Sequence, residues 1–139
     1  MSTVEQNKDL IRRYTDATWN GQNVEGDFYA PNAVIHSLSS PSDVSSLAQT
    51  AAYFRAALPD LSLHNTAVFG QEDRVFQHYT VTGTHRGAPL FNFPGTGREL
   101  TIAGINIFRI RSGKIVERWS IIDAADVFQQ LSAGQGGQQ

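Results

Sequence analysis

The residues best suited to chemistry lie between Gly104 and Asp123, in the stretch GINIFRIRSGKIVERWSIID. This stretch contains two carboxylates, Glu117 and Asp123, among aromatic and aliphatic side chains. A carboxylate in apolar surroundings has a raised pKa and can act as a general base near neutral pH. Asp123 is therefore the first candidate for acid/base catalysis.

The same stretch predicts a β-hairpin, because Ser112-Gly113 is a typical tight turn between two strands. If Arg111 pairs with Lys114 across the turn, strict alternation of side chains divides the hairpin into two faces. We expect one face to be interior: Ile102, Asn106, Phe108, Glu117, Trp119, Ile121 and Asp123. The other face carries Arg109, Arg111 and Arg118, which indicates contact with water or a partner.

The composition limits the functions open to the chain. With 139 residues, 40% of them hydrophobic, it is long enough for one domain with a substantial core. A formal net charge of −2 gives no electrostatic reason to expect nucleic acid or an anionic membrane as a partner. Cysteine is absent and no two histidines have metal-ligand spacing, so we expect no metal site. Neither a signal peptide nor a membrane span is recognisable, so a cytoplasmic protein is the default expectation.

The periodicity of the chain changes from helical to extended at Pro59. Helical spacing predicts a first helix from a cap at Ser2 or Thr3 to about Trp19, with Ser2 and Glu5 fitting a capping box. A second helix is predicted from Pro41 to Leu58. Extended segments are predicted at 33–38, 61–69, 74–85, 98–110 and 114–122, and a last short helix at 123–131.

This order of elements indicates an α+β fold. We expect a strongly curved antiparallel sheet wrapped over the N-terminal helices, giving a cone with an internal pocket. Residues 1–131 form the single domain in this interpretation, and residues 132–139 are a disordered tail.

Several further side chains are candidates for the site, each with a structural alternative. His85, at the end of the long strand, is a proton relay or a hydrogen-bonded strand-end residue. Trp119 lines the pocket or belongs to the core. Asn106, opposite Trp119, holds a ligand carbonyl or bonds to Glu117 or a buried water. Asp123 itself is a base or the N-cap of the last helix.

The remaining candidates lie at the expected pocket mouth. His36 is on the short strand that borders the mouth. Tyr53 points to the pocket rim, and Phe91, in an unusually apolar loop, caps the cavity or packs at a dimer interface. Glu117, near the hairpin turn, is better explained by a surface or ion-pair role.

Four motifs together resemble a known family. They are N-K-x-L-I-R-R-Y from Asn7, T-G-T-H-x-G from Thr82, P-x-T-G-R from Pro94 and G-K-I-V-E-x-W-x-x-x-D from Gly113. In this order they resemble the SnoaL-like polyketide cyclases of the nuclear transport factor two superfamily, over about residues 7–131. The resemblance implies an α+β cone that dimerises through the outer face of its sheet. It also implies an acid/base aspartate after the last Trp-containing strand, at the position of Asp123.

The resemblance and the residues together predict cofactor-independent acid/base chemistry on a hydrophobic, polyketide-like carbonyl compound. Asp123 would remove an acidic C–H proton, the enolate would attack a carbonyl of the same substrate in an aldol closure, and Asp123 or His85 would return the proton. Two alternatives stay open. One is a non-catalytic small-molecule-binding or accessory protein of the same fold. The other is a hydratase or epoxide-hydrolase relative, against which Arg109 and Arg118, on the face opposite Asp123, count.

Overall fold

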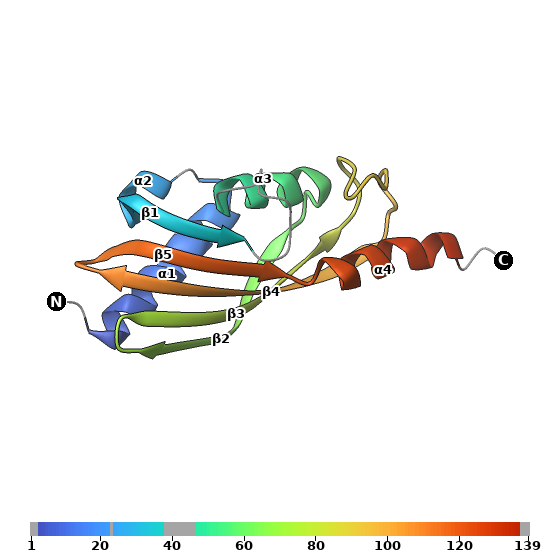
Figure 1. Cartoon of the computed structure of the whole chain (residues 1–139). Coiled ribbons are helices and arrows are strands. Elements are labelled where there is room, and N and C mark those ends of the chain that lie inside the picture. The colour runs from blue at the N-terminus through green and yellow to red at the C-terminus, as the bar shows by residue number, and fades with distance from the viewer. Residues whose placement is uncertain (1–2, 23, 38–46, 137–139) are drawn as a thin grey trace.

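The computed structural model describes residues 3–22, 24–37 and 47–136. Within these ranges the helices are α1 (Val4–Trp19), α2 (Glu25–Phe28), α3 (Leu47–Ala57) and α4 (Ala124–Gly136) (Figure 1). The strands are β1 (Tyr29–Ser37), β2 (Ser62–Gln71), β3 (Arg74–Thr84), β4 (Glu99–Arg111) and β5 (Lys114–Ile122). None of these helices is long and apolar enough to cross a membrane.

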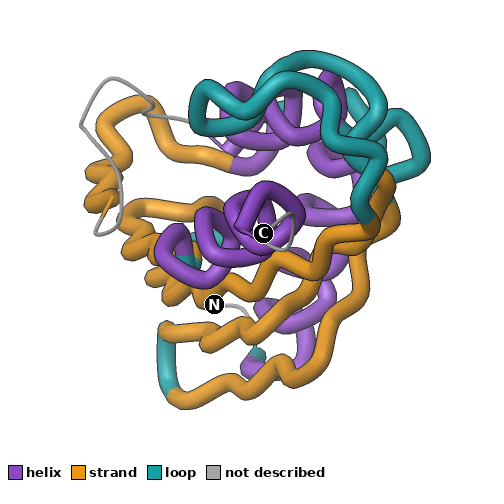
Figure 2. The backbone as a smooth tube through the Cα atoms, turned by 90° about the vertical axis from the view of Figure 1, so that its right-hand side faces the viewer, coloured by secondary structure: helices purple, strands orange, loops and turns teal. Residues whose placement is uncertain are grey.

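The strands form one curved sheet in the order β1-β5-β4-β3-β2. Strands β2 to β5 are an antiparallel meander, whereas β1 joins β5 in parallel. The predicted α+β class and curved sheet are therefore confirmed, and the sheet is mixed because β1 runs in the direction of its neighbour. Figure 2, which looks along the molecule, shows how the strands curve around the helices.

Helix α1 covers one face of the sheet, which we call the inner face. The helix begins at Thr3, whose hydroxyl accepts a hydrogen bond from Gln6 N while the Gln6 side chain accepts from Thr3 N. This capping box lies one residue beyond the predicted one. Ile11, Tyr14 and Trp19 are buried against the sheet.

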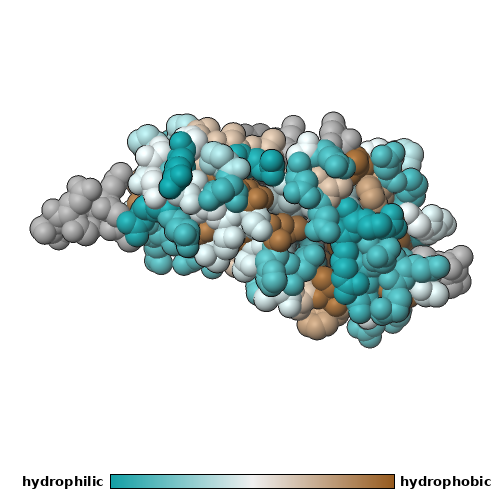
Figure 3. Space-filling model, turned by 180° about the vertical axis from the view of Figure 1, so that it is seen from behind, coloured by the Kyte–Doolittle hydropathy of each residue, from teal (hydrophilic) through white to brown (hydrophobic). Residues whose placement is uncertain are grey.

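The molecule seen from behind is mostly hydrophilic, with hydrophobic residues showing only in gaps (Figure 3).

Helices α3 and α4 differ from the predicted helices at their ends. The predicted start of the second helix at Pro41 lies outside the described residues, and α3 ends at Ala57, one residue before the predicted end. Helix α4 continues to Gly136 and so includes the first residues of the predicted tail. Val127 and Leu131 are fully buried and anchor this helix to the core.

The hairpin of β4 and β5 contains a β-bulge that the alternation rule cannot foresee. Arg111 pairs with Lys114 as predicted, but Ile110 then pairs with Ile115 and Arg109 with Glu117, so that β5 has one extra residue. A shift of one residue moves every later side chain of the strand to the other face. The predicted faces of β5 are therefore exchanged beyond the bulge.

Candidate functional site

A group of buried polar side chains lies between α1 and the inner face of the sheet. We call it the interior polar cluster, and each member is at most 3% exposed. Its members are Thr18, Trp19, Gln77, Tyr79, Asn106 and Arg118. They come from α1, β3, β4 and β5, so the tertiary fold alone brings them together.

Asn106 lies on the inner face, as the sequence predicts. Its Nδ2 donates to Gln77 Oε1 at 3.0 Å, and Gln77 Nε2 in turn donates to Asn65 Oδ1 at 2.7 Å and to Thr15 Oγ1 at 3.2 Å. The predicted pairing of Asn106 with Trp119 is wrong, because the bulge places Ser120 opposite Asn106. This network fixes the orientation of the Asn106 amide.

Five buried polar atoms of the cluster have no hydrogen-bond partner among the described residues. They are Thr18 Oγ1, Trp19 Nε1, Tyr79 Oη, Asn106 Oδ1 and Arg118 Nε. A buried polar group without a partner costs roughly 1–3 kcal/mol. Such groups in native proteins are normally satisfied by protein, ordered water or ligand. The cluster therefore has the composition of a polar binding site, with mostly donors unsatisfied.

Tyr79 occupies the space that Gly104 leaves open on the neighbouring strand. A Cβ atom at Gly104 would overlap the Tyr79 phenol, so the glycine allows this close approach. The Trp19 ring packs against Tyr79, with ring centroids 5.9 Å apart. Burial raises the pKa of the Tyr79 phenol, and the nearby charge of Arg118 opposes this effect. Tyr79 is consequently a protonated hydrogen-bond donor at neutral pH.

Arg118 was predicted on the outside of the sheet and lies on its inner face. Its Nη1 donates to Tyr29 Oη at 2.8 Å, and Tyr14 donates to the same oxygen at 3.0 Å. No carboxylate of the described chain forms an ion pair with Arg118. The inward arginine removes one objection to the hydratase or epoxide-hydrolase alternative, which would need an arginine and two aspartates around one water. In the described ranges, no aspartate forms an ion pair with Arg118.

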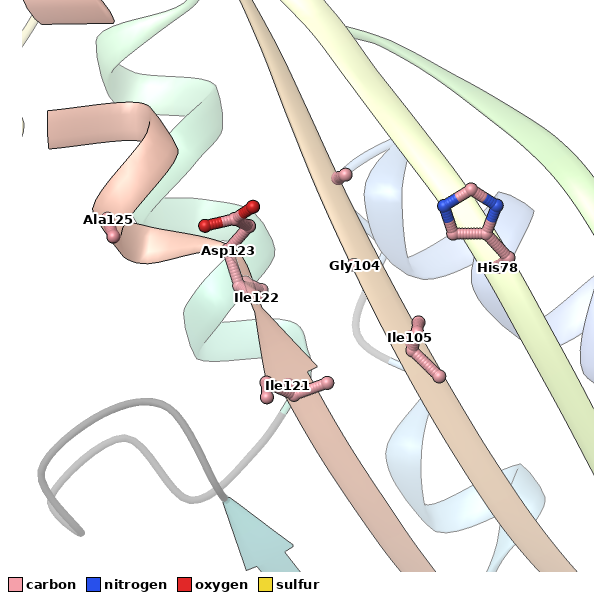
Figure 4. Close-up of a pocket in the computed structure, with 8 residues that line it drawn as sticks. His78, Gly104, Ile105, Ile121, Ile122, Asp123 and Ala125 are labelled. Carbon is pink, nitrogen blue, oxygen red and sulfur yellow. The ribbon is translucent and has the colours of Figure 1, made fainter. Parts of the chain in front are cut away.

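Asp123 lies outside this cluster, contrary to the prediction that it is buried. The bulge turns it to the outer face, where it is exposed. Its Oδ1 accepts a hydrogen bond from Asp126 N at 3.1 Å and caps α4, which confirms the alternative interpretation. Asp123 and His78 line an open groove of about 540 Å³, on either side of β4 (Figure 4).

His85 also lies apart from Asp123. It is fully buried, its Nδ1 is 3.1 Å from Thr96 Oγ1 and its Nε2 is 3.0 Å from Ala88 O. Both ring nitrogens thus hold the loop that follows β3, as expected of a hydrogen-bonded strand-end residue. No hydrogen bond joins His85 to Asp123 in the part of the chain that the structure describes.

Tyr53 and Phe91 come together where α3 meets this loop. The Tyr53 hydroxyl accepts a hydrogen bond from Phe91 N at 2.9 Å, and the two rings are 6.3 Å apart in an edge-on arrangement. Tyr53 is 43% exposed. Their contact agrees with a shared position at a rim, and their role in binding stays a prediction.

His36, Glu117 and Trp119 form a surface cluster on the outer face. The predicted inward position of Trp119 is therefore wrong, and the role of His36 in binding stays a prediction. The His36 ring stacks on Trp119 at 5.2 Å, and its Nε2 lies 2.7 Å from Glu117 Oε2. Arg109 Nε donates to the other oxygen of Glu117 at 3.2 Å. The hydrogen bond from His36, followed by that from Arg109, lowers the pKa of Glu117. The ion-pair interpretation of Glu117 is confirmed.

Sequence reasoning missed Arg118 and Tyr79 as site residues. Both stand in strands where each face receives a mixture of polar and apolar residues, so alternation gives no clear inner side. In β5 and the residue after it, alternation puts Glu117 and Ile121 on one face and Arg118 and Ile122 on the other. Each face thus has a charge and an isoleucine. No group of three or more His, Asp or Glu residues in the described ranges could hold a metal ion.

Comparison with known proteins gives a family model and several similar structures. The model described as SnoaL-like polyketide cyclase matches residues 8–131. AclR, a candidate hydroxylase from Streptomyces galilaeus, is 26% identical with a TM-score of 0.80, over 94% of this chain and 83% of that one. IdmH, a candidate polyketide cyclase from Streptomyces antibioticus, is 25% identical with a TM-score of 0.75, over 91% and 99%.

A candidate SnoaL-like polyketide cyclase from Jannaschia sp. CCS1 has the same fold. It is 22% identical with a TM-score of 0.75, over 96% of both chains. Comparison with curated protein sequences gives no significant match.

Proposed function

The chain belongs to the SnoaL-like polyketide cyclase family, and from this premise we propose that it closes a ring in a hydrophobic, polyketide-like carbonyl compound without a cofactor. The observation that carries the proposal is the interior polar cluster, whose buried donors Tyr79, Trp19 and Arg118 have unsatisfied atoms. Donors in a dry interior are worth most at an oxygen that gains negative charge during the reaction.

The proposed reaction is an intramolecular aldol closure. The substrate loses a C–H proton to solvent water, the enolate carbon bonds to a carbonyl carbon of the same molecule, and the carbonyl oxygen becomes an alkoxide that takes a proton back from water. Tyr79 and Arg118 stabilise the charged oxygen by hydrogen bonds, and the Gln77–Asn106 network presents Asn106 Oδ1 as an acceptor for a substrate hydroxyl. Holding the two reacting carbons in contact supplies a further large part of the rate.

The first experiment follows turnover of a panel of linear polyketide esters by wild-type protein and Tyr79→Phe. Loss of one donor to a developing oxyanion lowers kcat by about 10²–10³-fold. The control is Thr82→Val, which removes an exposed hydroxyl from the same strand, β3. Equal turnover by all three proteins would remove Tyr79 from the reaction.

Asp123 stands at the position of the family's acid/base aspartate, and Asp123→Asn tests that role cleanly. Asparagine caps a helix as well as aspartate does, so the α4 cap on Asp126 N is kept while the base is lost. Because Asp123 is exposed on the outer face, we expect turnover to be retained. A loss of more than about 10²-fold, the range for a general base, would restore Asp123 as the base.

One observation favours a second function, a binding protein without catalysis. No carboxylate of the described residues bonds to the interior polar cluster, so this cluster contains donors and an amide oxygen but no strong base. A polyketide-like compound that binds tightly and is recovered unchanged over many hours would support this alternative.

We also propose that two copies associate through the outer face of the sheet. Four large apolar side chains on this face are between 40% and 65% exposed: Val34, Phe69, Ile105 and Ile121. A second copy would cover them by two-fold contact. Sedimentation should show a dimer that Ile105→Asp dissociates, whereas Gln129→Asp, at an exposed position of α4, leaves it intact. A wild-type monomer at high concentration would exclude this interface.

A further inference from the structure

Arg118 is a buried cation without a matching anion among the described residues. Arg118 is 3% exposed and lies on the inner face of β5. Arginine cannot lose its charge in a protein. The ion pairs of the described residues join Lys8 to Glu5, Arg13 to Asp9, and Arg109 and His36 to Glu117. Arg118 takes part in none of them. Buried charges are normally paired, because desolvation of a lone ion is expensive.

The atoms around Arg118 show which kind of partner is missing. Its Nη1 donates to Tyr29 Oη, while its Nε has no acceptor among the described residues. The Tyr79 phenol lies over Gly104 of β4, the strand between β3 and β5, and its hydroxyl is also buried without a partner among the described residues. Two unsatisfied donors on one inner face, one of them charged, favour an oxygen acceptor that carries negative charge.

We infer that the molecule bound in the interior is an anion, a hydrophobic ring compound with an ionised enolate or carboxylate oxygen that Arg118 and Tyr79 bind together. This inference rests on the proposed function for the site and for the carbonyl nature of the compound, but it does not require catalysis. Ile102 and Phe108, buried on the inner face of β4, make the surroundings of the cluster apolar. The charged oxygen thus becomes the feature by which the site selects its ligand.

Trp19 provides a direct reporter of binding. It is one of two tryptophans in the chain, and its indole lies against Tyr79, whereas Trp119 lies on the outer face. In a Trp119→Phe background, fluorescence comes from the interior alone. The probes are dimedone, a cyclic 1,3-diketone that is ionised at neutral pH, and its neutral methyl enol ether. Cyclohexanecarboxylate and cyclohexanecarboxamide form a second pair, which separates enolate from carboxylate recognition.

We expect at least one anion to bind about 10- to 100-fold more tightly than its neutral partner, the range for hydrogen bonds to a charged group. Arg118→Met should remove this preference, and Arg118→Lys should keep part of it. The control Arg111→Met, at the exposed end of the same hairpin, should behave as the parent. Circular dichroism establishes that each variant is folded.

Three results would overturn the inference: equal affinity for both members of each pair, an anion preference that survives in Arg118→Met, or no response of Trp19 to any probe. The last would mean that ordered water satisfies the cluster. The proposed ring closure fails in a different way. Charge-selective binding without turnover of any polyketide ester would end the catalytic proposal and leave the anion site in place.

Discussion

Replacement of Arg118 by methionine should make the ligand-free protein more stable. An arginine that serves to bind an anion lowers the free energy of unfolding when the anion is absent, because its charge stays buried without a partner. Methionine has a similar unbranched length and fills the same space without charge. The expected gain distinguishes an arginine kept for a ligand from one that holds the fold together.

The magnitude follows from the contacts of the side chain. The variant loses one charged hydrogen bond, the 2.8 Å bond to Tyr29, worth about 1.5–3 kcal/mol. Tyr29 retains the hydrogen bond from Tyr14. Against this loss stands the effective desolvation penalty of a buried ion, which is several kcal/mol. The free energy of unfolding should therefore rise by about 1–3 kcal/mol, or roughly 3–4 °C in Tm for each kcal/mol in a domain of this size.

Thermal and urea unfolding without ligand measure this change, with Arg111→Met as the control. The control removes an exposed charge and should alter stability by less than about 0.5 kcal/mol. A loss of about 3–5 kcal/mol in Arg118→Met, the result of breaking a buried ion pair, would refute the reasoning. It would mean that the arginine already has an anionic partner within the chain.

Three further changes test the surrounding structure. Gly104→Ala should destabilise the protein by about 1–3 kcal/mol in urea unfolding, because the added methyl group overlaps Tyr79, whereas Gly26→Ala, which meets no atom, should not show this overpacking loss. The pKa of Glu117 is lowered in the folded state, first by His36, so this group adds stability above its ordinary pKa near 4.5 and loses that contribution as the pH falls through the lower folded value. Wild type should therefore exceed Glu117→Gln at pH 6 and converge with it under acid conditions, and a constant difference would contradict the assignment. Asp123→Ala should cost about 1 kcal/mol through the lost cap of α4, and Asp123→Asn much less, with the two variants compared by thermal unfolding.

The sequence was sufficient for the elements because each carries a local signal. Apolar spacing at Ile11 and Tyr14 marks α1, and the change at Pro59 marks the start of the sheet. The Ser112-Gly113 turn sets the first pair of the hairpin correctly. The parallel pairing of β1 with β5 has no such local signal, because it joins segments about 80 residues apart and depends on the whole fold.

The site was much less predictable, and the cause is a single extra residue in β5. Strict alternation placed Asp123 and Trp119 inside and Arg118 outside, and the bulge exchanges them. Both arrangements bury at least one charged side chain, so elementary desolvation arguments do not separate them. Asn106 was placed correctly because it lies on β4, whose alternation is uninterrupted. Tyr79 becomes a site residue only through Gly104 on the adjacent strand, which no linear pattern reveals.

The interior polar cluster has hydrogen-bond donors but no carboxylate among the described residues. The substrate C–H proton must therefore be lost to a group other than a base of this cluster. If the ligand enters as an enolate, its C–H proton has already gone to solvent, and the protein needs only to hold the charged oxygen and the ring geometry. The pH dependence of kcat/KM should then follow the acidity of the substrate, because the free reactants set this constant. Two polyketide esters of different acidity should give profiles displaced by the difference in their pKa values, and Asp123→Asn should displace neither. A rising limb that is the same for both substrates and vanishes in Asp123→Asn would instead identify an enzyme base and place the chemistry at the outer groove.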